Sequence, residues 1–153
     1  MKSQDLTFSF TVDQTPDEVF DAIKQVSSWW PGVIAGVTDR LGGEFTYRYK
    51  DMHSSTQKIT EWVPGKRVAW HVTDSHLSFL KEKDEWTGTD VVFDIARKGG
   101  KTTLTFTHEG LTPGVECYGA CSDGWGYIIT ECLPAFITTG KQVDGVMESG
   151  KAA

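Results

Sequence analysis

The sequence lacks the features that would place it in a membrane, in a secretory pathway or on nucleic acid. It has no run of 18 apolar residues, so no transmembrane helix is predicted. No charged N-terminal segment is followed by an apolar run, as in a signal peptide. Only 15 residues are Lys or Arg against 21 Asp or Glu, and the net charge of −6 argues against nucleic acid and anionic membranes. We therefore expect a cytoplasmic protein.

Catalytic and metal-binding motifs are also missing. There is no Gly-x-Ser-x-Gly, no His-Glu-x-x-His and no glycine-rich phosphate loop. Three cysteines are too few and odd in number for a disulfide framework, and Cys117, Cys121 and Cys132 fit no standard zinc spacing. We expect thiols packed as small hydrophobic groups, and neither a metal nor a cofactor.

Aromatic residues, in contrast, are abundant: the 153 residues include six Trp and eight Phe. This length corresponds to one domain. So many large apolar side chains suit either a thick core or an aromatic-lined pocket. We expect a single domain over residues 1–140 and a polar tail over residues 141–153.

The first 30 residues predict a strand followed by helical structure. Apolar and polar residues alternate over residues 6–12, which is typical of a half-buried strand. Thr15 and Glu18 are spaced as a capping box around Pro16, so a helix should begin there and run through Ile23. A second short helix or turn is expected before Pro31.

Alternation then returns in about five segments, around residues 45–49, 57–62, 67–72, 91–95 and 104–108. The glycines of residues 98–101 predict a tight hairpin. Residues 73–89 are polar and charged, so we expect an exposed loop. Sequential strands joined by turns predict an antiparallel sheet.

One long helix should close the chain. It is expected to begin between Glu116 and Ser122, and one stripe of this helix is apolar: Trp125, Ile128, Ile129, Cys132 and Phe136. Pro134 lies inside the stripe and should bend the helix, because it removes a bond to the carbonyl of Thr130. The stripe must be buried against the apolar face of the sheet, which makes the fold class α+β.

Several short stretches carry a family resemblance, in order and at matching spacing: residues 15–20, 29–31, 41–45, 61–68, 85–89, 108–111 and 124–125. Together they resemble the START-like (SRPBCC) superfamily, in the branch related to the activator of Hsp90 ATPase, over residues 6–140. The resemblance implies the helix-grip fold, a curved antiparallel sheet wrapped around the C-terminal helix with a cavity between them. Members bind lipids, hormones or polyketides, and some are enzymes.

The expected ligand site is the inner face of this sheet and the facing stripe of the helix. Aromatic residues of the inner face point toward one interior, and the alternative is that they form a solid core. The predicted ligand-binding residues are Trp30, Tyr47, Tyr49, Trp70, Phe93, Phe106, His108, Trp125, Ile128, Ile129 and Cys132.

His108 is the one histidine predicted to point inward. It could bind a ligand or act as an acid or base with Tyr47 or Tyr49, and the alternative is a structural histidine. His71 is expected on the outer face, and His53 and His76 in loops.

The leading hypothesis is therefore binding of a small hydrophobic or aromatic molecule between the sheet and the C-terminal helix. One alternative is a co-chaperone-like interaction domain with a chaperone partner and a role in stress response, which follows from the resemblance. Another is a cofactor-free enzyme, and the sequence leaves open whether there is any catalysis. Self-association as a homodimer through an exposed strand edge is a further possibility.

Overall fold

A computed structural model describes residues 5–50, 52–78, 80, 81, 83–112, 116 and 118–140. Along the chain the elements are β1 (Leu6–Val12), α1 (Pro16–Lys24), η1 (Val26–Ser28), β2 (Val33–Gly36), β3 (Glu44–Tyr49), β4 (His53–Val63), β5 (Arg67–Leu77), β6 (Asp90–Lys98), β7 (Lys101–Glu109), α2 (Tyr118–Tyr127), η2 (Ile128–Cys132) and α3 (Leu133–Thr139). The predicted tail over residues 141–153 lies outside the described residues.

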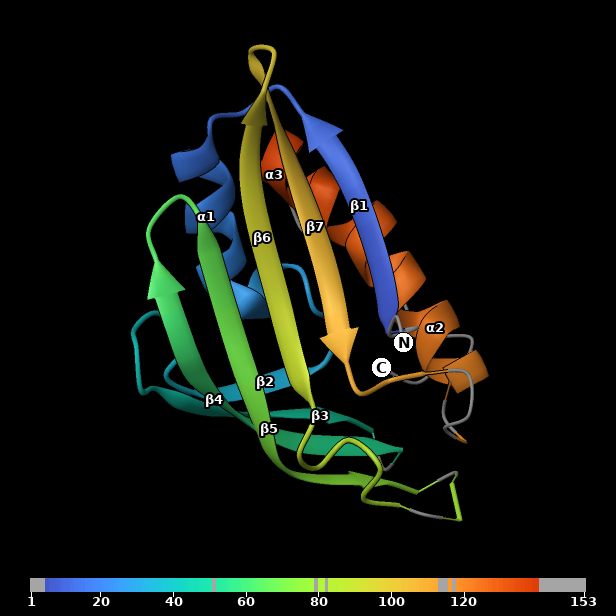
Figure 1. Cartoon of the computed structure of the whole chain (residues 1–153). Helices are drawn as coiled ribbons and strands as arrows, with labels where there is room; N and C mark the ends of the chain where they lie inside the picture. The colour runs from blue at the N-terminus through green and yellow to red at the C-terminus, as the bar shows by residue number, and fades with distance from the viewer. Residues whose placement is uncertain are drawn as a thin grey trace.

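The strands form one curved antiparallel sheet in the order β1-β7-β6-β5-β4-β3-β2. Figure 1 shows α2 and α3 behind the β1 side of the sheet, and α1 behind β5 and β6. The helices therefore fill the concave side, and the buried apolar side chains lie between them and the sheet. This arrangement confirms the predicted helix-grip fold.

The start of α1 shows how closely local sequence determines this element. The hydroxyl of Thr15 accepts a hydrogen bond from the backbone N–H of Glu18 at 3.1 Å, and the Glu18 carboxylate accepts one from the N–H of Thr15 at 2.9 Å. This reciprocal pair is the predicted capping box. The helix then buries Val19, Phe20 and Ile23, which fixes it against the sheet.

The sheet bends at β4 and β5, which carry two irregularities in their register. These lie between Thr56 and Gln57 and between Ile59 and Glu61. A bulge increases local twist and bends the strand that contains it. β5 pairs with β6 only over its first half, from Arg67 to His71, so its second half turns away with β3 and β4. The sheet thus has an upper part (β1, β6, β7) and a lower part (β2–β4 and the end of β5), as Figure 1 shows.

Two expectations about the lower part of the sheet were wrong. Strand β5 continues to Leu77, so His76 lies in a strand and not in a loop, and His53 is the first residue of β4. The polar side chains of Thr73, Asp74 and His76 are exposed, whereas Ser75 and Leu77 are buried. The segment looked like a loop because its solvent face is polar and the bulge interrupts the alternation. The four-residue strand β2 was not predicted either.

The C-terminal helical segment, which Pro134 was predicted to bend, is not a regular α-helix throughout. A π-helical turn, η2, separates α2 from α3, and the N–H of Leu133 donates to the carbonyl of Ile128 five residues before it. Pro134 lies in the first turn of α3, where its missing N–H costs least. The predicted stripe still faces inward: Trp125, Ile128, Ile129 and Cys132 are buried and Phe136 is half-buried.

The hairpin between β6 and β7 turns at two glycines. Gly99 and Gly100 have φ of 59° and 86°, the positive values that the predicted tight turn requires.

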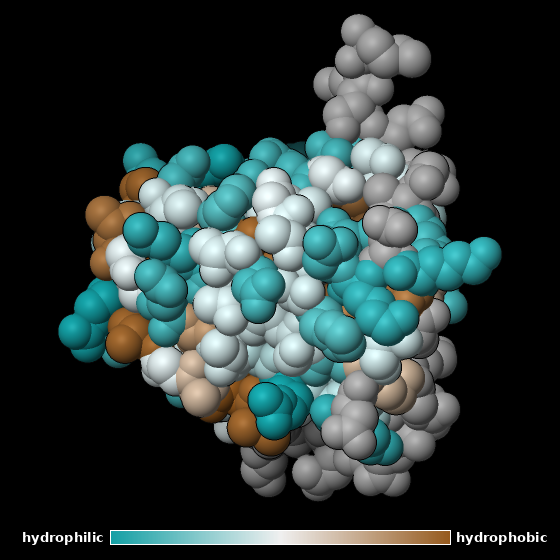
Figure 2. Space-filling view, turned by 90° about the horizontal axis from the view of Figure 1, so that it is seen from below, coloured by the Kyte–Doolittle hydropathy of each residue, from teal (hydrophilic) through white to brown (hydrophobic). Residues whose placement is uncertain are grey.

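Seen from below, the molecule is mainly hydrophilic or neutral, with hydrophobic patches toward its edge (Figure 2). None of the helices in the described residues has the length and apolar character to cross a bilayer.

Candidate functional site

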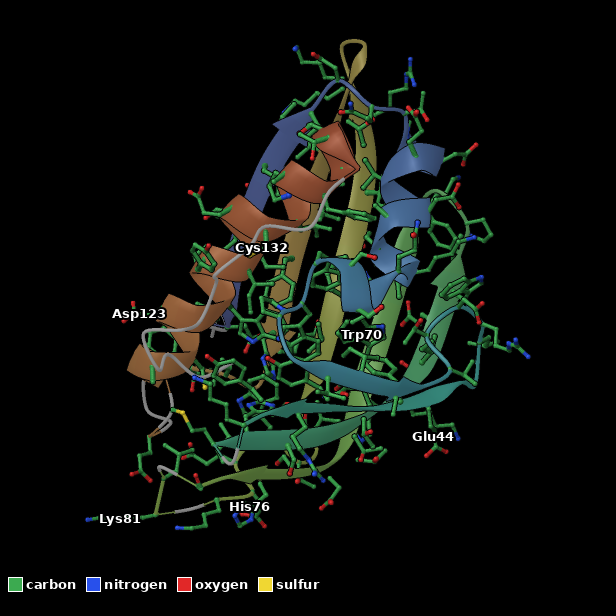
Figure 3. All side chains as sticks on the ribbon, turned by 180° about the vertical axis from the view of Figure 1, so that it is seen from behind. Glu44, Trp70, His76, Lys81, Asp123 and Cys132 are labelled. Atoms are coloured by element: carbon green, nitrogen blue, oxygen red, sulfur yellow. The ribbon has the colours of Figure 1, made fainter. Side chains whose placement is uncertain are left out.

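All eleven residues predicted to bind a ligand are buried in the interior between sheet and helices. Figure 3 labels two of them, Trp70 on the sheet and Cys132 on the facing helical segment, with side chains filling the space between. Burial raises the pKa of the Cys132 thiol to about 12, so this thiol is protonated at neutral pH. The structure thus brings the predicted set together as one cluster. Binding by that cluster remains a prediction.

The rings of this cluster contact one another directly. Trp30 stacks on Tyr47 with centroids 3.8 Å apart and lies 5.0 Å from the ring of Trp125. Trp70 packs against Trp30 at 5.9 Å and edge-on against Phe93 at 5.0 Å. A ligand that entered between these residues would therefore have to displace rings that now pack together.

His108 is held by a chain of hydrogen bonds in the upper part of the sheet. Its Nδ1 accepts the indole N–H of Trp125 at 3.1 Å, and its Nε2 lies 2.8 Å from the hydroxyl of Thr89. That hydroxyl in turn donates to the carbonyl of Trp86 at 2.6 Å. The chain assigns the proton of the imidazole to Nε2.

The environment of His108 is that of a structural residue. Its side chain is fully buried, and burial lowers its pKa to about 3 although Asp5 acts in the opposite direction. A neutral ring with both nitrogens engaged has no free position for proton transfer to a substrate. The acid–base role considered from the sequence therefore has no support in this geometry.

A second buried polar group lies in the lower part of the sheet, and of its five residues sequence reasoning predicted only Tyr49 as a site residue. It comprises Tyr49, His53, Ser55, Gln57 and Trp86, here called the polar cluster. His53, Ser55 and Gln57 alternate along β4 with their side chains inward. Tyr49 pairs with His53 across β3 and β4, and Trp86 packs edge-on against His53 with centroids 4.5 Å apart. These five residues therefore form one connected group.

Hydrogen bonds within the polar cluster leave several atoms unused. The amide nitrogen of Gln57 donates to the hydroxyl of Ser55 at 2.5 Å, and His53 Nε2 lies 3.0 Å from the same hydroxyl. Within the described residues, five buried side-chain atoms have no hydrogen-bond partner, and four of them belong to the polar cluster: Tyr49 Oη, His53 Nδ1, Gln57 Oε1 and Trp86 Nε1; the fifth is Gln14 Oε1, outside the cluster. Each such atom costs about 1–3 kcal/mol when nothing satisfies it. Groups of this kind call for a water molecule or a ligand.

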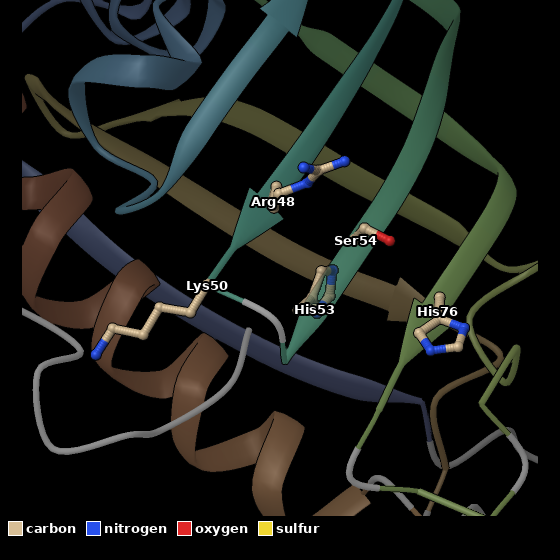
Figure 4. A pocket seen from close by; sticks show the side chains of 5 residues that line it. All are labelled: Arg48, Lys50, His53, Ser54 and His76. Carbon is tan, nitrogen blue, oxygen red and sulfur yellow. The ribbon is translucent and has the colours of Figure 1, made fainter.

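The polar cluster borders a cavity at the end of the β3–β4 hairpin. This cavity has a volume of about 190 Å³ and is lined by Arg48, Lys50, His53, Ser54 and His76; Figure 4 shows these side chains. His53 is thus the residue that belongs to both the interior and the cavity. We call this recess the hairpin cavity.

Other cavities in the described part of the chain lie elsewhere. A recess of about 200 Å³ adjoins the hairpin cavity on the outer face of the sheet, sharing Arg48 and Ser54 and adding Asp74. A larger one, about 640 Å³, opens between the start of α1 and the β4–β5 turn. None of the residues that line it carries one of the buried unpartnered atoms just named.

The described residues contain no group of three or more metal-ligating side chains. Cys132 is a free thiol, but Cys121 is disulfide-bonded. The prediction that the cysteines are thiols is therefore wrong for Cys121. Cys117 lies outside the described residues.

Parts of the polar cluster did carry a sequence signal. Residues 53–59 alternate His, Ser, Gln and Ile on the buried face, a period-two pattern that polar side chains disguise. Trp86 lies in the motif Glu85-Trp86-Thr87-Gly88-Thr89 and is fully buried, although the surrounding segment was expected to be an exposed loop. A large aromatic residue inside a charged segment was the available hint.

Comparison with known proteins agrees with the fold. Residues 13–136 match the family described as activator of Hsp90 ATPase homolog 1-like protein. The chain belongs to this family. No curated protein matches the chain in sequence.

Solved structures similar to this family member share its fold at low sequence identity. The Aha1 dimer from Colwellia psychrerythraea has a TM-score of 0.71 at 20% identity, over 90% of this chain and 98% of that one. DynU16, from the dynemicin biosynthetic locus, has a TM-score of 0.64 at 17% identity, over 94% of this chain and 51% of that one. CalU16 from Micromonospora echinospora has a TM-score of 0.60 at 19% identity, over 88% and 76%.

Proposed function

We propose that this protein binds a small, mostly apolar molecule in the interior between the curved sheet and the C-terminal helical segment, with the polar part of that molecule held by the polar cluster. The observation that supports this most is the set of four buried polar atoms without partners in one connected group. A core that served packing alone would be expected to satisfy them, as the chain around His108 does.

The chemistry of the polar cluster indicates what the ligand should offer. The unused atom of Trp86 is an N–H donor and that of Gln57 is an acceptor, and the hydroxyl of Tyr49 can act as either. A ligand with both an acceptor and a donor, such as a hydroxyl beside a carbonyl, would use them. The surrounding Trp30, Tyr47 and Trp125 provide flat apolar surface, which suits a ring or an acyl chain.

Entry would require a local change of shape in two elements beside the polar cluster. Trp86 lies between β5 and β6 and stacks on Trp125 of α2 at 5.7 Å. Helix α2 contains Gly119, Gly124 and Gly126 and is followed by the π turn η2. Glycines and a π turn weaken a helix, so a displacement of α2 together with Trp86 is the route we favour.

Thermal unfolding in the presence of compounds tests this function. Fatty acids, polyketides and aromatic metabolites are added one at a time, and the Tm is recorded. A ligand at 100 times its Kd should stabilise the fold by about 2.7 kcal/mol, or about 5–10 °C in Tm for this chain length. If no compound raises the Tm, and a crystal structure shows water molecules bonded to all four atoms, the proposal is wrong.

The same experiment should be repeated on Gln57→Leu and Thr102→Val. The first removes an unpartnered buried oxygen of the polar cluster at nearly constant volume. The second removes a buried hydroxyl that already donates to the carbonyl of Gln14 at 2.6 Å, far from the cluster. We expect Gln57→Leu to abolish most of the ligand-induced shift, and Thr102→Val to retain it.

Self-association is a second proposal that the fold supports. β2 is an edge strand, since it pairs only with β3, and Val33 on it is 66% exposed. An exposed edge can pair with another copy of itself, and one similar structure is that of an Aha1 dimer. A chaperone partner remains a prediction from the resemblance.

A further inference from the structure

The hairpin cavity differs from the interior in charge. Arg48, Lys50 and His76 are exposed around it, while His53 lies at its inner side. Within the described residues, none of these three cationic or basic side chains has an ion-pair partner. Arg67 shows the contrast, since it contacts both Glu61 and Asp94. Among the described residues, the positive charge at the hairpin cavity therefore has no ion-pair partner, in a chain of net charge −6.

The backbone holds these side chains in a row. Arg48 pairs with Ser54 across β3 and β4, and Ser54 pairs with His76 across β4 and β5. Lys50 follows β3 with a φ of 50°, the one non-glycine residue with positive φ in the described chain. Strand geometry places such opposite residues about 4.5–5.5 Å apart, so a guanidinium, a hydroxyl and an imidazole line one side of the cavity.

His53 connects this charge with the polar cluster. The hydroxyl of Ser55 accepts from Gln57, and its own proton has one acceptor within reach in the described residues, His53 Nε2. That bond places the proton of the neutral imidazole on Nδ1, which has no partner. His53 is 1% exposed yet lines the cavity. It thus supplies a buried N–H donor that a negatively charged oxygen can accept.

Among the described residues, one carboxylate lines the recess beside this surface. Asp74 lines the adjoining recess together with Arg48 and Ser54, but it is not among the residues that line the hairpin cavity and it forms no ion pair with Arg48. The donors among the residues that line the hairpin cavity are therefore Arg48, Lys50, His53, Ser54 and His76. A guanidinium with an ammonium is the pair that proteins use for carboxylate, sulfonate and phosphate groups.

We infer that the ligand is an amphipathic anion, whose acidic group binds in the hairpin cavity at Arg48 and Lys50 and whose apolar body enters the interior past His53. This inference rests on the proposed function, because it names the class of the same ligand. It assigns a role to Arg48, Lys50 and His76, which lie outside the aromatic cluster.

Two fluorescent dyes of nearly the same shape test the inference. 1-Anilinonaphthalene-8-sulfonate carries a sulfonate, and N-phenyl-1-naphthylamine is the same body without it. We expect the protein, shown by circular dichroism to be folded, to bind the sulfonate at least about tenfold more tightly, since a hydrogen bond to a charged group is stronger than a neutral one. Raising NaCl to 0.5 M should weaken only the sulfonate dye.

Variants locate the effect. Arg48→Gln and Lys50→Gln should each weaken the sulfonate dye several-fold, up to about tenfold, and leave the neutral dye unchanged. Lys58→Gln is the matched control, because Lys58 is an exposed lysine on the same strand as Ser54 that does not line the cavity. It should change neither affinity.

Each alternative outcome is separable from the others. If both dyes bind equally and Arg48→Gln changes neither, ligand binding stands and the anionic class is overturned. If millimolar inorganic phosphate displaces the sulfonate dye but not the neutral one, the site takes a free anion, and the amphipathic assignment is overturned. If neither dye binds and no compound raises the Tm, the proposed function itself fails.

Discussion

The two halves of the sheet each bury a histidine, and the two histidines differ in how many of their ring nitrogens form hydrogen bonds. His108 in the upper part and His53 in the lower part are both at most 1% exposed, and burial lowers the pKa of each to about 3. His108 uses both nitrogens in a continuous hydrogen-bond chain, whereas His53 uses one and borders a cavity. The two side chains are equally buried, so the difference in hydrogen bonding distinguishes a histidine that stabilises the fold from one that is available to a ligand.

The lowered pKa that the two histidines share predicts the largest effect, a loss of stability in acid. Unfolded histidines have a pKa near 6.5, so between pH 6.5 and 3 the unfolded chain binds up to two more protons than the folded chain. Stability is therefore full above pH 6.5 and falls as the pH falls, by about 2.7 kcal/mol per pH unit for two histidines. Urea unfolding at pH 7.5, 6.0 and 5.0 measures this slope.

The contribution of each histidine can be separated by substitution. His53→Gln and His108→Gln should each reduce the slope between pH 6.0 and 5.0 by about half. His53 also feels the charge of His108, which lowers its pKa further. A slope that stays the same in both variants would show that other groups govern the acid unfolding.

Truncation should separate the two histidines at neutral pH. His108→Ala leaves the indole N–H of Trp125 without its acceptor and opens a buried void, so we expect a loss of about 3–5 kcal/mol. His53→Ala removes a side chain beside an existing cavity that water can fill, and Ser55 still accepts from Gln57. Its cost should be about 1–2 kcal/mol. Equal losses in urea unfolding would contradict the distinction between the two sites.

The upper part of the sheet was largely predictable from sequence, whereas in the lower part the predicted strands at residues 45–49, 57–62 and 67–72 are present but β2 and the extensions of β4 and β5 were missed. Alternation over residues 6–12 and 104–108, the capping box at Thr15 and the glycine turn at residues 98–101 each act locally, and the structure contains them all. Pro134 likewise indicated an irregularity in the C-terminal helix, because its missing N–H acts locally, and a π turn lies directly before α3.

The polar cluster depended on contacts that no local pattern contains. Ser55 and Gln57 are polar residues on a buried face, which binary patterning assigns to solvent, and a bulge shifts the register beside Gln57. Trp86 reaches the interior from a charged segment and meets His53, 33 positions earlier, only after the sheet has bent. A site made by curvature is visible only in three dimensions.

Removing the hydroxyl from each of the two tyrosines of β3 should change stability less than the histidine substitutions do, and in opposite directions. The hydroxyl of Tyr47 donates to the carbonyl of Pro31, whereas that of Tyr49 has no partner among the residues that the structure describes. Tyr47→Phe should lower stability by about 1 kcal/mol, and Tyr49→Phe should leave it unchanged or raise it by up to about 1 kcal/mol. Urea unfolding of the ligand-free protein gives both values. If both variants lose the same stability, Tyr49 Oη has a partner in solution and should be removed from the proposed binding atoms.

A substitution on an edge strand should give the smallest change in stability, because Val33 on β2 is at the surface. Edge strand β1 contacts η2 and α3, which cover it, whereas β2 offers an open edge with Val33 exposed. Val33→Lys should change the free energy of unfolding by no more than about 0.5 kcal/mol, since the side chain meets water.

A charge on an edge strand opposes pairing with another copy. Light scattering at several concentrations should therefore show association of the unmodified protein that Val33→Lys weakens. Thr11→Lys is the matched control on β1, where the side chain is also exposed but lies on the edge that helices cover, and it should leave association unchanged. A monomer at every concentration would remove the homodimer proposal without affecting ligand binding, because the hairpin cavity and the polar cluster belong to a single copy of the chain.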